Sequence, residues 1–231
     1  MNTSSLRKTS QLDPVEAVDR LVTGLGHRLR SPLTGLRGYG ELLGQESESP
    51  SRDRWGAGLK DGLQDLELLI EGISRYQVPR EIHSSLQPAR GLLEEAWRLA
   101  LRISPTARSR GVELDCDMSS VSVLDVDAFH FRNLLINLLQ NALDASPEGG
   151  RVRVSDAEDA CFVIRDQGPG LGGLSPEEIC EPFFTTRRDR AGLGLSVSRI
   201  IAERHGCHLR WDEPADGGLR VRVIRNSAEK E

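Results

Sequence analysis

The sequence predicts two domains: a helical hairpin that forms a four-helix bundle with a second copy, followed by an α+β domain. The hairpin is predicted by apolar residues at alternating gaps of three and four positions in two segments, separated by the polar residues 46–53. The second domain is predicted by short apolar runs after Pro79, with helical stretches between them. The expected division of the chain is a flexible tail at 1–12, the hairpin at 13–78, the α+β domain at 79–227 and a tail at 228–231.

The first helix has a start signal at Asp13. Asp13 suits the N-cap, Pro14 suits the first helical position, and Glu16 stands three residues after the cap. Pro32 removes one helical hydrogen bond, so we expect a kink beside it. The apolar stripe of this helix has heptad spacing and consists of Val15, Val18, Val22, Leu25, Leu29 and Leu36.

The second helix carries a similar stripe. One hairpin covers only half of such a seam, whereas two hairpins enclose it, so the pattern predicts a homodimer. The members of the stripe are Leu59, Leu63, Leu66, Ile70 and Ile73.

The region after Pro79 alternates between short apolar runs and longer helical patterns, as expected for an α+β domain. Helices are predicted at 89–104, 128–145 and 192–204. The runs that indicate strands are Val112–Leu114, Val121–Val126, Val152–Val154, Cys161–Ile164, His208–Trp211 and Leu219–Ile224.

The composition excludes several classes of protein. Hydrophobic residues make up 38% of the chain, which is enough for a packed core, and the net charge of −5 argues against non-specific binding of nucleic acid. No apolar run reaches 18 residues and the N-terminus lacks the apolar segment of a signal peptide, so we expect no membrane span and a cytoplasmic location. No CxxC pair occurs, so we expect ordinary thiols rather than a zinc site at Cys116, Cys161, Cys180 and Cys207.

A row of asparagines marks the helix predicted at 128–145. Asn137 and Asn141 are four residues apart and so share one helical face, which Asn133 extends by one turn. Asparagine is a poor helix former. By itself the row fits either a solvated face or a line of amide oxygens directed at a metal–phosphate group.

Two glycine-containing segments follow. In the first, Asp166 comes directly after a predicted strand, and Gly168 and Gly170 permit a tight turn close to a ligand. A carboxylate in that position can accept a hydrogen bond from an exocyclic amine, although a plain turn also fits. In the second, Gly192 and Gly194 precede a helix, whose free amides and dipole favour phosphate.

The order and spacing of these segments carry more information than each one alone. Asp166 lies 25 residues after Asn141, Gly192 lies 22 residues after Gly170, and the segment EPFFTTR (181–187) stands between the last two. The combination resembles the Bergerat, or GHKL, ATP-binding domain shared by sensor histidine kinases, Hsp90, type II topoisomerases and MutL. The EPFFTT and GLGLS segments resemble the histidine-kinase branch.

The first helix strengthens this resemblance. Its segment LGHRLRSPL (25–33) resembles the phosphoacceptor motif of the histidine kinases, with the phosphoacceptor at His27. Independently, if Val22 is heptad position a, His27 falls at position f and points away from the seam. A histidine that meets both a nucleotide and a partner protein has to be exposed in this way.

The resemblance implies roles for individual residues. It implies that Asn141 coordinates Mg²⁺, which prefers oxygen ligands, that Asn137 lines the phosphate region, and that Asp166 binds the adenine amine. Residues 171–191 would form a mobile lid. The other residues that the resemblance assigns to ATP binding are Gly168, Gly170, Phe183, Phe184, Thr186, Arg187, Gly192, Leu193, Gly194 and Leu195.

The implied reaction is autophosphorylation of His27 by ATP, followed by transfer to an aspartate in the receiver domain of a response regulator. Arg28 stands where the family usually has an acidic or amide residue, and a guanidinium is no base near neutral pH. Ser31 occupies the position that in the family positions water for dephosphorylating the regulator.

Two alternatives remain open at this point. Because of Arg28, the chain is a candidate for a nucleotide-binding regulatory or phosphatase-dominant module of the same fold with weak autokinase activity. The other alternative is a serine kinase of the same ATPase superfamily that acts on a partner. We expect the chain to comprise little beyond the catalytic core, so that its input arrives through a sensory partner protein, the bundle itself or a segment outside this sequence.

Overall fold

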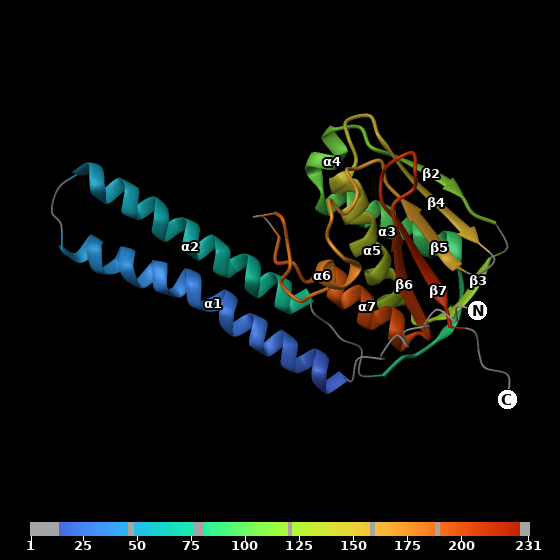
Figure 1. Cartoon of the computed structure of the whole chain (residues 1–231), viewed down its shortest axis with the longest axis horizontal. Helices are drawn as coiled ribbons and strands as arrows, with labels where there is room; N and C mark the ends of the chain where they lie inside the picture. Colours follow the sequence, from blue (N-terminus) through green and yellow to red (C-terminus); the bar gives the residue numbers. More distant parts are fainter. Residues whose placement is uncertain are drawn as a thin grey trace, which may run out of the picture. The chain divides into compact units, whose positions relative to one another are not determined.

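The computed structural model describes residues 14–45, 49–75, 81–119, 122–157, 160–187 and 190–226, and the chain divides into two compact units after Glu71. The first unit is built from two long helices, α1 (Pro14–Gln45) and α2 (Ser49–Arg75), which lie side by side (Figure 1). The helix α1 continues through Pro32 without a break. The predicted N-cap Asp13 and the two predicted tails, 1–12 and 228–231, lie outside the described residues.

The connection between the two helices is shorter than the predicted turn at 46–53. Residues 49–53 already belong to α2, and 46–48 lie outside the described residues. The prediction was wrong there because polar residues occur in the first turn of a helix as well as in loops. Pro50 stands in the first turn of α2, where a proline is favoured because its missing N–H is not needed.

Small residues let α2 approach α1 closely. A Cβ atom added to Gly58 would lie 2.5 Å from the ring of Tyr39, and one added to Gly62 would lie 3.1 Å from the side chain of Leu36. The contact is therefore made by an aromatic and an aliphatic side chain of α1 against glycines of α2. None of the described side chains of α1 and α2 is fully buried, however.

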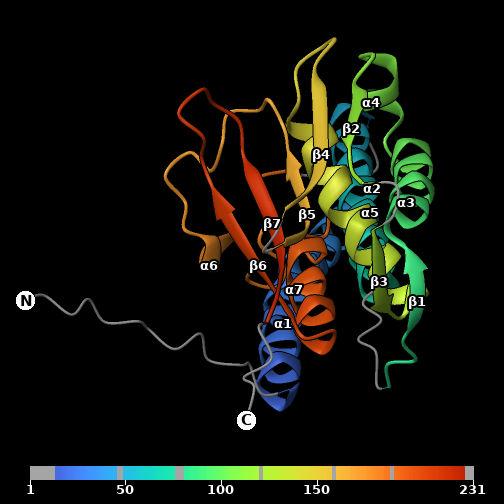
Figure 2. The ribbon, with the colours of Figure 1, turned by 90° about the vertical axis from the view of Figure 1, so that its right-hand side faces the viewer.

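The second unit contains a five-stranded sheet in the order β2-β4-β5-β7-β6, in which only β2 and β4 run parallel, and a separate ribbon of β1 and β3. Helices α3, α5 and α7 pack on one face of the sheet (Figure 2). The helices are α3 (Ala89–Ile103), α4 (Pro105–Ser109), α5 (Ala128–Ala145), α6 (Pro176–Ile179) and α7 (Gly194–Arg204). The strands are β1 (Ser85–Pro88), β2 (Glu113–Asp117), β3 (Val123–Val126), β4 (Arg151–Ala157), β5 (Ala160–Arg165), β6 (Cys207–Asp212) and β7 (Arg220–Arg225).

Every helix and strand predicted in this region is present within a few residues of its expected ends, so these predictions are confirmed. Three short elements, β1, α4 and α6, were not predicted. Four or five residues give too few positions for a period to show. The helix α6 instead depends on a local capping box between Ser175 and Glu178.

The core lies between the sheet and α5. Phe131, Leu135 and Leu139 of α5 are fully buried and belong to one cluster with Phe162 and Val223 of the sheet. Because the apolar face of α5 is directed into this core, its asparagine row lies on another face of the helix.

The other face of the sheet carries charged residues. One row across all five strands consists of Asp115, Arg153, Arg165, Arg220 and Asp212, paired strand by strand. The aspartates at its two ends form ion pairs with the neighbouring arginines, Arg153 with Asp115 at 2.8 Å and Arg220 with Asp212. This face is therefore suited to solvent, and the strands alternate as expected for a sheet covered on one side. Within the described part of the chain, no helix is both long and apolar enough to cross a membrane.

Candidate functional site

The asparagine row of α5 is held at both ends of the helix. At the start, the side chain of Asp127 accepts hydrogen bonds from the amides of Phe129 and His130, both at 3.1 Å. At the end, Arg110 donates to the carbonyl oxygens of Leu143 (2.8 Å) and Ser146 (2.7 Å). A guanidinium there satisfies free carbonyls and complements the helix dipole. The row is therefore carried by a helix that is capped at both ends.

The row also contacts the glycine segment. Nδ2 of Asn137 donates to the carbonyl oxygen of Gly194 at 3.2 Å. Asn133 and Asn137 are half-buried, whereas Asn141 is exposed. The structure thus brings together two segments that are 57 residues apart, and it leaves the amide of Asn141 accessible to a ligand.

Asp166 is a buried carboxylate at the end of β5, only 5% exposed. Its Oδ1 accepts hydrogen bonds from the amides of Gly168 (2.8 Å) and Leu219 (3.0 Å). Both of these donors are on Oδ1, and among the described residues none donates to Oδ2, which is thus left to accept a hydrogen bond from a ligand amine. Burial raises the pKa of the Asp166 carboxyl above its usual value, and the two amides partly offset this.

Glycines are required around Asp166 because the backbone approaches itself closely. A Cβ atom on Gly168 would lie 2.7 Å from Cβ of Ala145, at the end of α5. Gly218 has a φ of +80°, and a Cβ atom there would lie 2.1 Å from the carbonyl oxygen of Asp166. The loop between β6 and β7 thus forms one side of the turn after Asp166.

The EPFFTT segment and the glycine segment are also in contact. A Cβ atom on Gly192, whose φ is +72°, would lie 2.5 Å from the carbonyl oxygen of Phe184. Phe183 is buried and has a φ of +67°, which is costly for a bulky residue. Two unusual backbone conformations therefore face each other where the segment meets α7.

The start of α7 combines inward side chains with free amides. Leu193 is buried and Leu195 packs against the core. Gly194 is the first residue of the helix, whose first-turn amides have no acceptor within the helix. Such an N-terminus favours an anion.

The last predicted lid residues have different surroundings. Thr186 is exposed. Arg187 forms an ion pair with Asp144 of α5 at 2.9 Å, and Arg190 lies 2.9 Å from the same oxygen of Asp144. The expected mobility of residues 171–191 stays a prediction.

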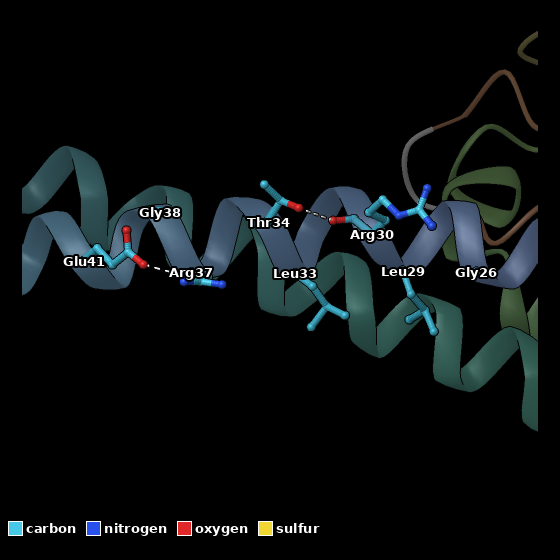
Figure 3. Close-up of a pocket in the computed structure, with 8 residues that line it drawn as sticks. All are labelled: Gly26, Leu29, Arg30, Leu33, Thr34, Arg37, Gly38 and Glu41. Carbon is cyan, nitrogen blue, oxygen red and sulfur yellow. Dashed lines mark hydrogen bonds and ion pairs between the residues drawn. The ribbon is translucent and has the colours of Figure 1, made fainter.

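In the first unit, His27 lies within α1, and nothing is described of its side chain, so its predicted exposure stays a prediction. Arg28 and Ser31 are exposed on the same helix. A groove along α1 begins beside this segment, and Figure 3 shows that one helix supplies its whole lining. The lining residues are Gly26, Leu29, Arg30, Leu33, Thr34, Arg37, Gly38 and Glu41.

Comparison with known proteins agrees with this geometry. Residues 126–227 match the family described as "Histidine kinase-, DNA gyrase B-, and HSP90-like ATPase". Over 88% of its length the chain is 28% identical to the signal transduction histidine-protein kinase AtoS of Escherichia coli, and over 86% it is 35% identical to the signal transduction histidine-protein kinase/phosphatase MprB of Mycolicibacterium smegmatis. The chain is a homologue of the sensor histidine kinases.

The chain spans 34% of AtoS and 43% of MprB, so it corresponds to less than half of either relative. Among solved structures, the histidine kinase ThkA, in a complex with the response regulator protein TrrA, matches 94% of this chain and 64% of its own at a TM-score of 0.63. At 22% identity this likeness shows the fold alone. The second unit thus has the α/β ATP-binding fold of the histidine kinases.

Asp144, Gly218 and Arg190 contribute to the site of this histidine-kinase homologue, although the sequence did not predict them. Asp144 was detectable, since it lies three residues after Asn141 on the same face of α5. The adjacent Gly217 and Gly218 indicated a turn, but the contact of Gly218 with Asp166 joins distant segments. Nothing in the sequence around Arg190 indicated its ion pair with Asp144. Among the described residues, no group of three or more histidine, cysteine or acidic side chains is placed to hold a metal ion.

Proposed function

We propose that this chain is the catalytic core of a two-component histidine kinase, which phosphorylates His27 with ATP and passes the phosphoryl group to an aspartate of a response regulator. The observation that supports this most strongly is the joint occurrence, in one homologue of the sensor histidine kinases, of the LGHRLRSPL segment and the Asp166 site. Arg28 does not by itself favour the alternative of a weakly active module, because the relatives are named as kinases or kinase/phosphatases.

Adenine is bound by Asp166 in this proposal. With Oδ1 occupied by two backbone amides, Oδ2 accepts a hydrogen bond from the exocyclic amine of ATP. Gly168 and Gly170 shape the wall beside the base, since Gly168 packs directly on Ala145. The base is thus recognised by a carboxylate that the backbone already holds in place.

The phosphates are bound between α5 and the start of α7. Backbone amides of Gly192, Leu193, Gly194 and Leu195 provide donors there, and Asn137 braces this segment through Gly194. The exposed Asn141 suits Mg²⁺, which is commonly held by one or two protein oxygens with water and phosphate. When bound, Mg²⁺ would neutralise phosphate charge. Phe183, Phe184 and Thr186 belong to the lid over this region.

Phosphoryl transfer then requires His27 to meet the γ-phosphorus in line with the leaving oxygen. An imidazole nitrogen of His27 forms the new bond as the bond to the β,γ-bridging oxygen breaks, and ADP leaves with that electron pair. Arg28 attracts the transferring phosphoryl group rather than removing a proton. Ser31, one turn away, supplies a hydroxyl for positioning water when the regulator is dephosphorylated.

The hairpin is proposed to form the core of a homodimer. The predicted stripe of α2 divides into two sets: Leu59 and Leu66 are half-buried, whereas Leu63 and Ile70 are 50% and 61% exposed. Each set has heptad spacing. We infer that the exposed set faces the second copy, which completes a four-helix bundle. A response regulator would reach His27 along the groove of α1, and the input would come through a sensory partner or an adjoining segment.

The decisive experiment is incubation with γ-labelled ATP. The wild type is expected to incorporate acid-labile, base-stable label, and His27→Gln is expected to incorporate none, while His83→Gln, which changes an exposed histidine of the other unit, serves as the matched control. Persistence of acid-labile label in His27→Gln would refute the assignment of the phosphoacceptor. Acid-stable label would indicate a serine kinase instead.

The nucleotide site is tested separately with Asp166→Asn. Its amide keeps an oxygen for the two backbone donors but turns an N–H₂ group toward the adenine amine, so two donors face each other. We expect at least about a tenfold loss of ATP affinity, because a site built to accept a hydrogen bond rejects a second donor. Isothermal titration against ATP measures this, and unchanged affinity would place adenine elsewhere.

A further inference from the structure

Two arginines that flank the glycine segment share one carboxylate oxygen of α5. Nη1 of Arg187 and Nη2 of Arg190 each lie 2.9 Å from Oδ2 of Asp144. The side chain of Asp144 is only 13% exposed, so the cluster is partly shielded from water. Two guanidinium groups thus converge on one carboxylate oxygen, and a second anion can compete with that carboxylate for either of them.

The two arginines differ in how far their side chains are exposed to solvent. Arg190 also lies 3.3 Å from Oγ of Ser104, at the junction of α3 and α4, and its side chain is 28% exposed. The side chain of Arg187 is 40% exposed. An incoming anion therefore recruits Arg187 more readily than Arg190.

The cluster lies beside the asparagine row. Asn137, Asn141 and Asp144 are spaced by four and three residues, so they share one face of α5. Asn137 contacts Gly194 at the start of α7. Asp144 is thus a negative charge one turn from the residue proposed to hold Mg²⁺, in a place where the proposed ligand is itself strongly negative.

We infer that Asp144 is a specificity-determining residue that competes with the terminal phosphate of ATP for Arg187. This inference rests on the proposed function, in which these residues bind the phosphates of ATP. ATP exchanges the carboxylate for its terminal phosphate as the partner of Arg187, and Arg190 stays on Asp144. ADP lacks that phosphate and leaves both ion pairs intact. Asp144 therefore lowers the affinity for ATP while leaving that for ADP nearly unchanged.

The substitution Asp144→Asn tests this, because it keeps the shape of the side chain and removes its charge. Isothermal titration of the full chain with ATP and with ADP, both with Mg²⁺, is expected to show about fivefold tighter binding of ATP, in line with one partly exposed ion pair, and a change within about twofold for ADP. In the Arg187→Gln background, Asp144→Asn is expected to have no selective effect on ATP.

The matched control is Arg190→Gln, which removes the other arginine of the cluster. Asp144 then holds Arg187 alone and more tightly, so ATP binding is expected to weaken while ADP binding is unchanged.

Equal tightening of ATP and ADP binding in Asp144→Asn would overturn the inference, because it would indicate a general effect of charge. Weakening of both would also overturn it, because it would indicate a structural role for Asp144. Binding requires no phosphoryl transfer, so loss of autophosphorylation refutes only the proposed function. A wild type that does not bind ATP refutes both.

Discussion

The two units of the chain differ in how completely they bury their apolar side chains. In the second unit Phe131, Leu135 and Phe162 are inaccessible to solvent. In the first unit none of the described side chains is fully buried, and Leu63 and Ile70 are 50% and 61% exposed. The second unit therefore has a core of its own, whereas the hairpin is expected to obtain one only by association.

The two units also differ in how they hold their functional residues. Asp166 is fixed by two backbone amides and by a glycine that approaches within contact distance. Arg28 and Ser31 lie exposed on a helix surface. A site that binds a small nucleotide gains from being organised in advance, whereas a segment that is visited by two different partners has to remain accessible.

The largest expected effect tests the difference in burial. Leu135→Ala removes a fully buried side chain of α5 and is expected to lower the free energy of unfolding by about 2–5 kcal/mol. Leu63→Ala removes a side chain that is half-exposed in one copy, so at concentrations where the chain is monomeric it is expected to change the free energy of unfolding by no more than about 0.5 kcal/mol. Urea denaturation followed by circular dichroism measures both.

Association adds a second measurement to this comparison. Leu63→Glu places a charge on the exposed stripe and is expected to shift the chain from dimer to monomer in sedimentation equilibrium, without loss of ATP binding. An unchanged sedimentation profile would mean that the hairpin obtains its core in another way. Loss of ATP binding would mean that the two units are not independent.

The next effect concerns two adjacent glycines. Gly217 and Gly218 both have positive φ, +89° and +80°, but a Cβ atom on Gly217 meets nothing within 4 Å, whereas one on Gly218 meets the backbone of Asp166. Gly217→Ala is expected to cost about 1 kcal/mol of stability from backbone strain alone. Gly218→Ala is expected to cost more, about 2–3 kcal/mol, and to weaken ATP binding as well.

Thermal denaturation and ATP titration of the two variants separate strain from contact. If both variants lost ATP affinity equally, the loop between β6 and β7 would matter through its conformation and not through its contact with Asp166. The two substitutions add the same methyl group at adjacent positions, of which Gly217 is exposed and Gly218 is buried.

The fold of the second unit could be predicted from the sequence. Each strand and helix buries only one side, so its apolar residues recur at a regular spacing along the sequence. The runs at Val152–Val154 and Cys161–Ile164 alternate with charged or half-buried neighbours and became β4 and β5. The pairing of Gly218 with Asp166 and of Arg190 with Asp144 had no such signal, because contacts between distant segments leave no local period. The turn at 46–53 was misplaced since polar composition alone does not distinguish a loop from the first turn of a helix.

The smallest expected effect is a pH dependence confined to the second unit. Nε2 of His205 accepts a hydrogen bond from the amide of Asp127 at 3.1 Å, and Nδ1 lies 2.7 Å from the carbonyl oxygen of Ile201. This pair of contacts fits a neutral imidazole with its hydrogen on Nδ1. Burial lowers the pKa of His205 below its usual value, the hydrogen bond with Ile201 and the charge of Asp127 oppose this, and His130 adds to it.

The unfolded chain therefore binds a proton at His205 at a higher pH than the folded chain does. The stabilisation is fully present above the unfolded pKa, about 6.5, and is lost as the pH falls below it, by no more than about 1.4 kcal/mol per pH unit for a single proton. Urea denaturation between pH 7.5 and pH 5.5 is expected to show this loss in the wild type and in His83→Gln, but not in His205→Gln. Because His205 joins α7 to the start of α5, the loss belongs to the unfolding of the second unit, and an equal slope in all three proteins would show that another group titrates there.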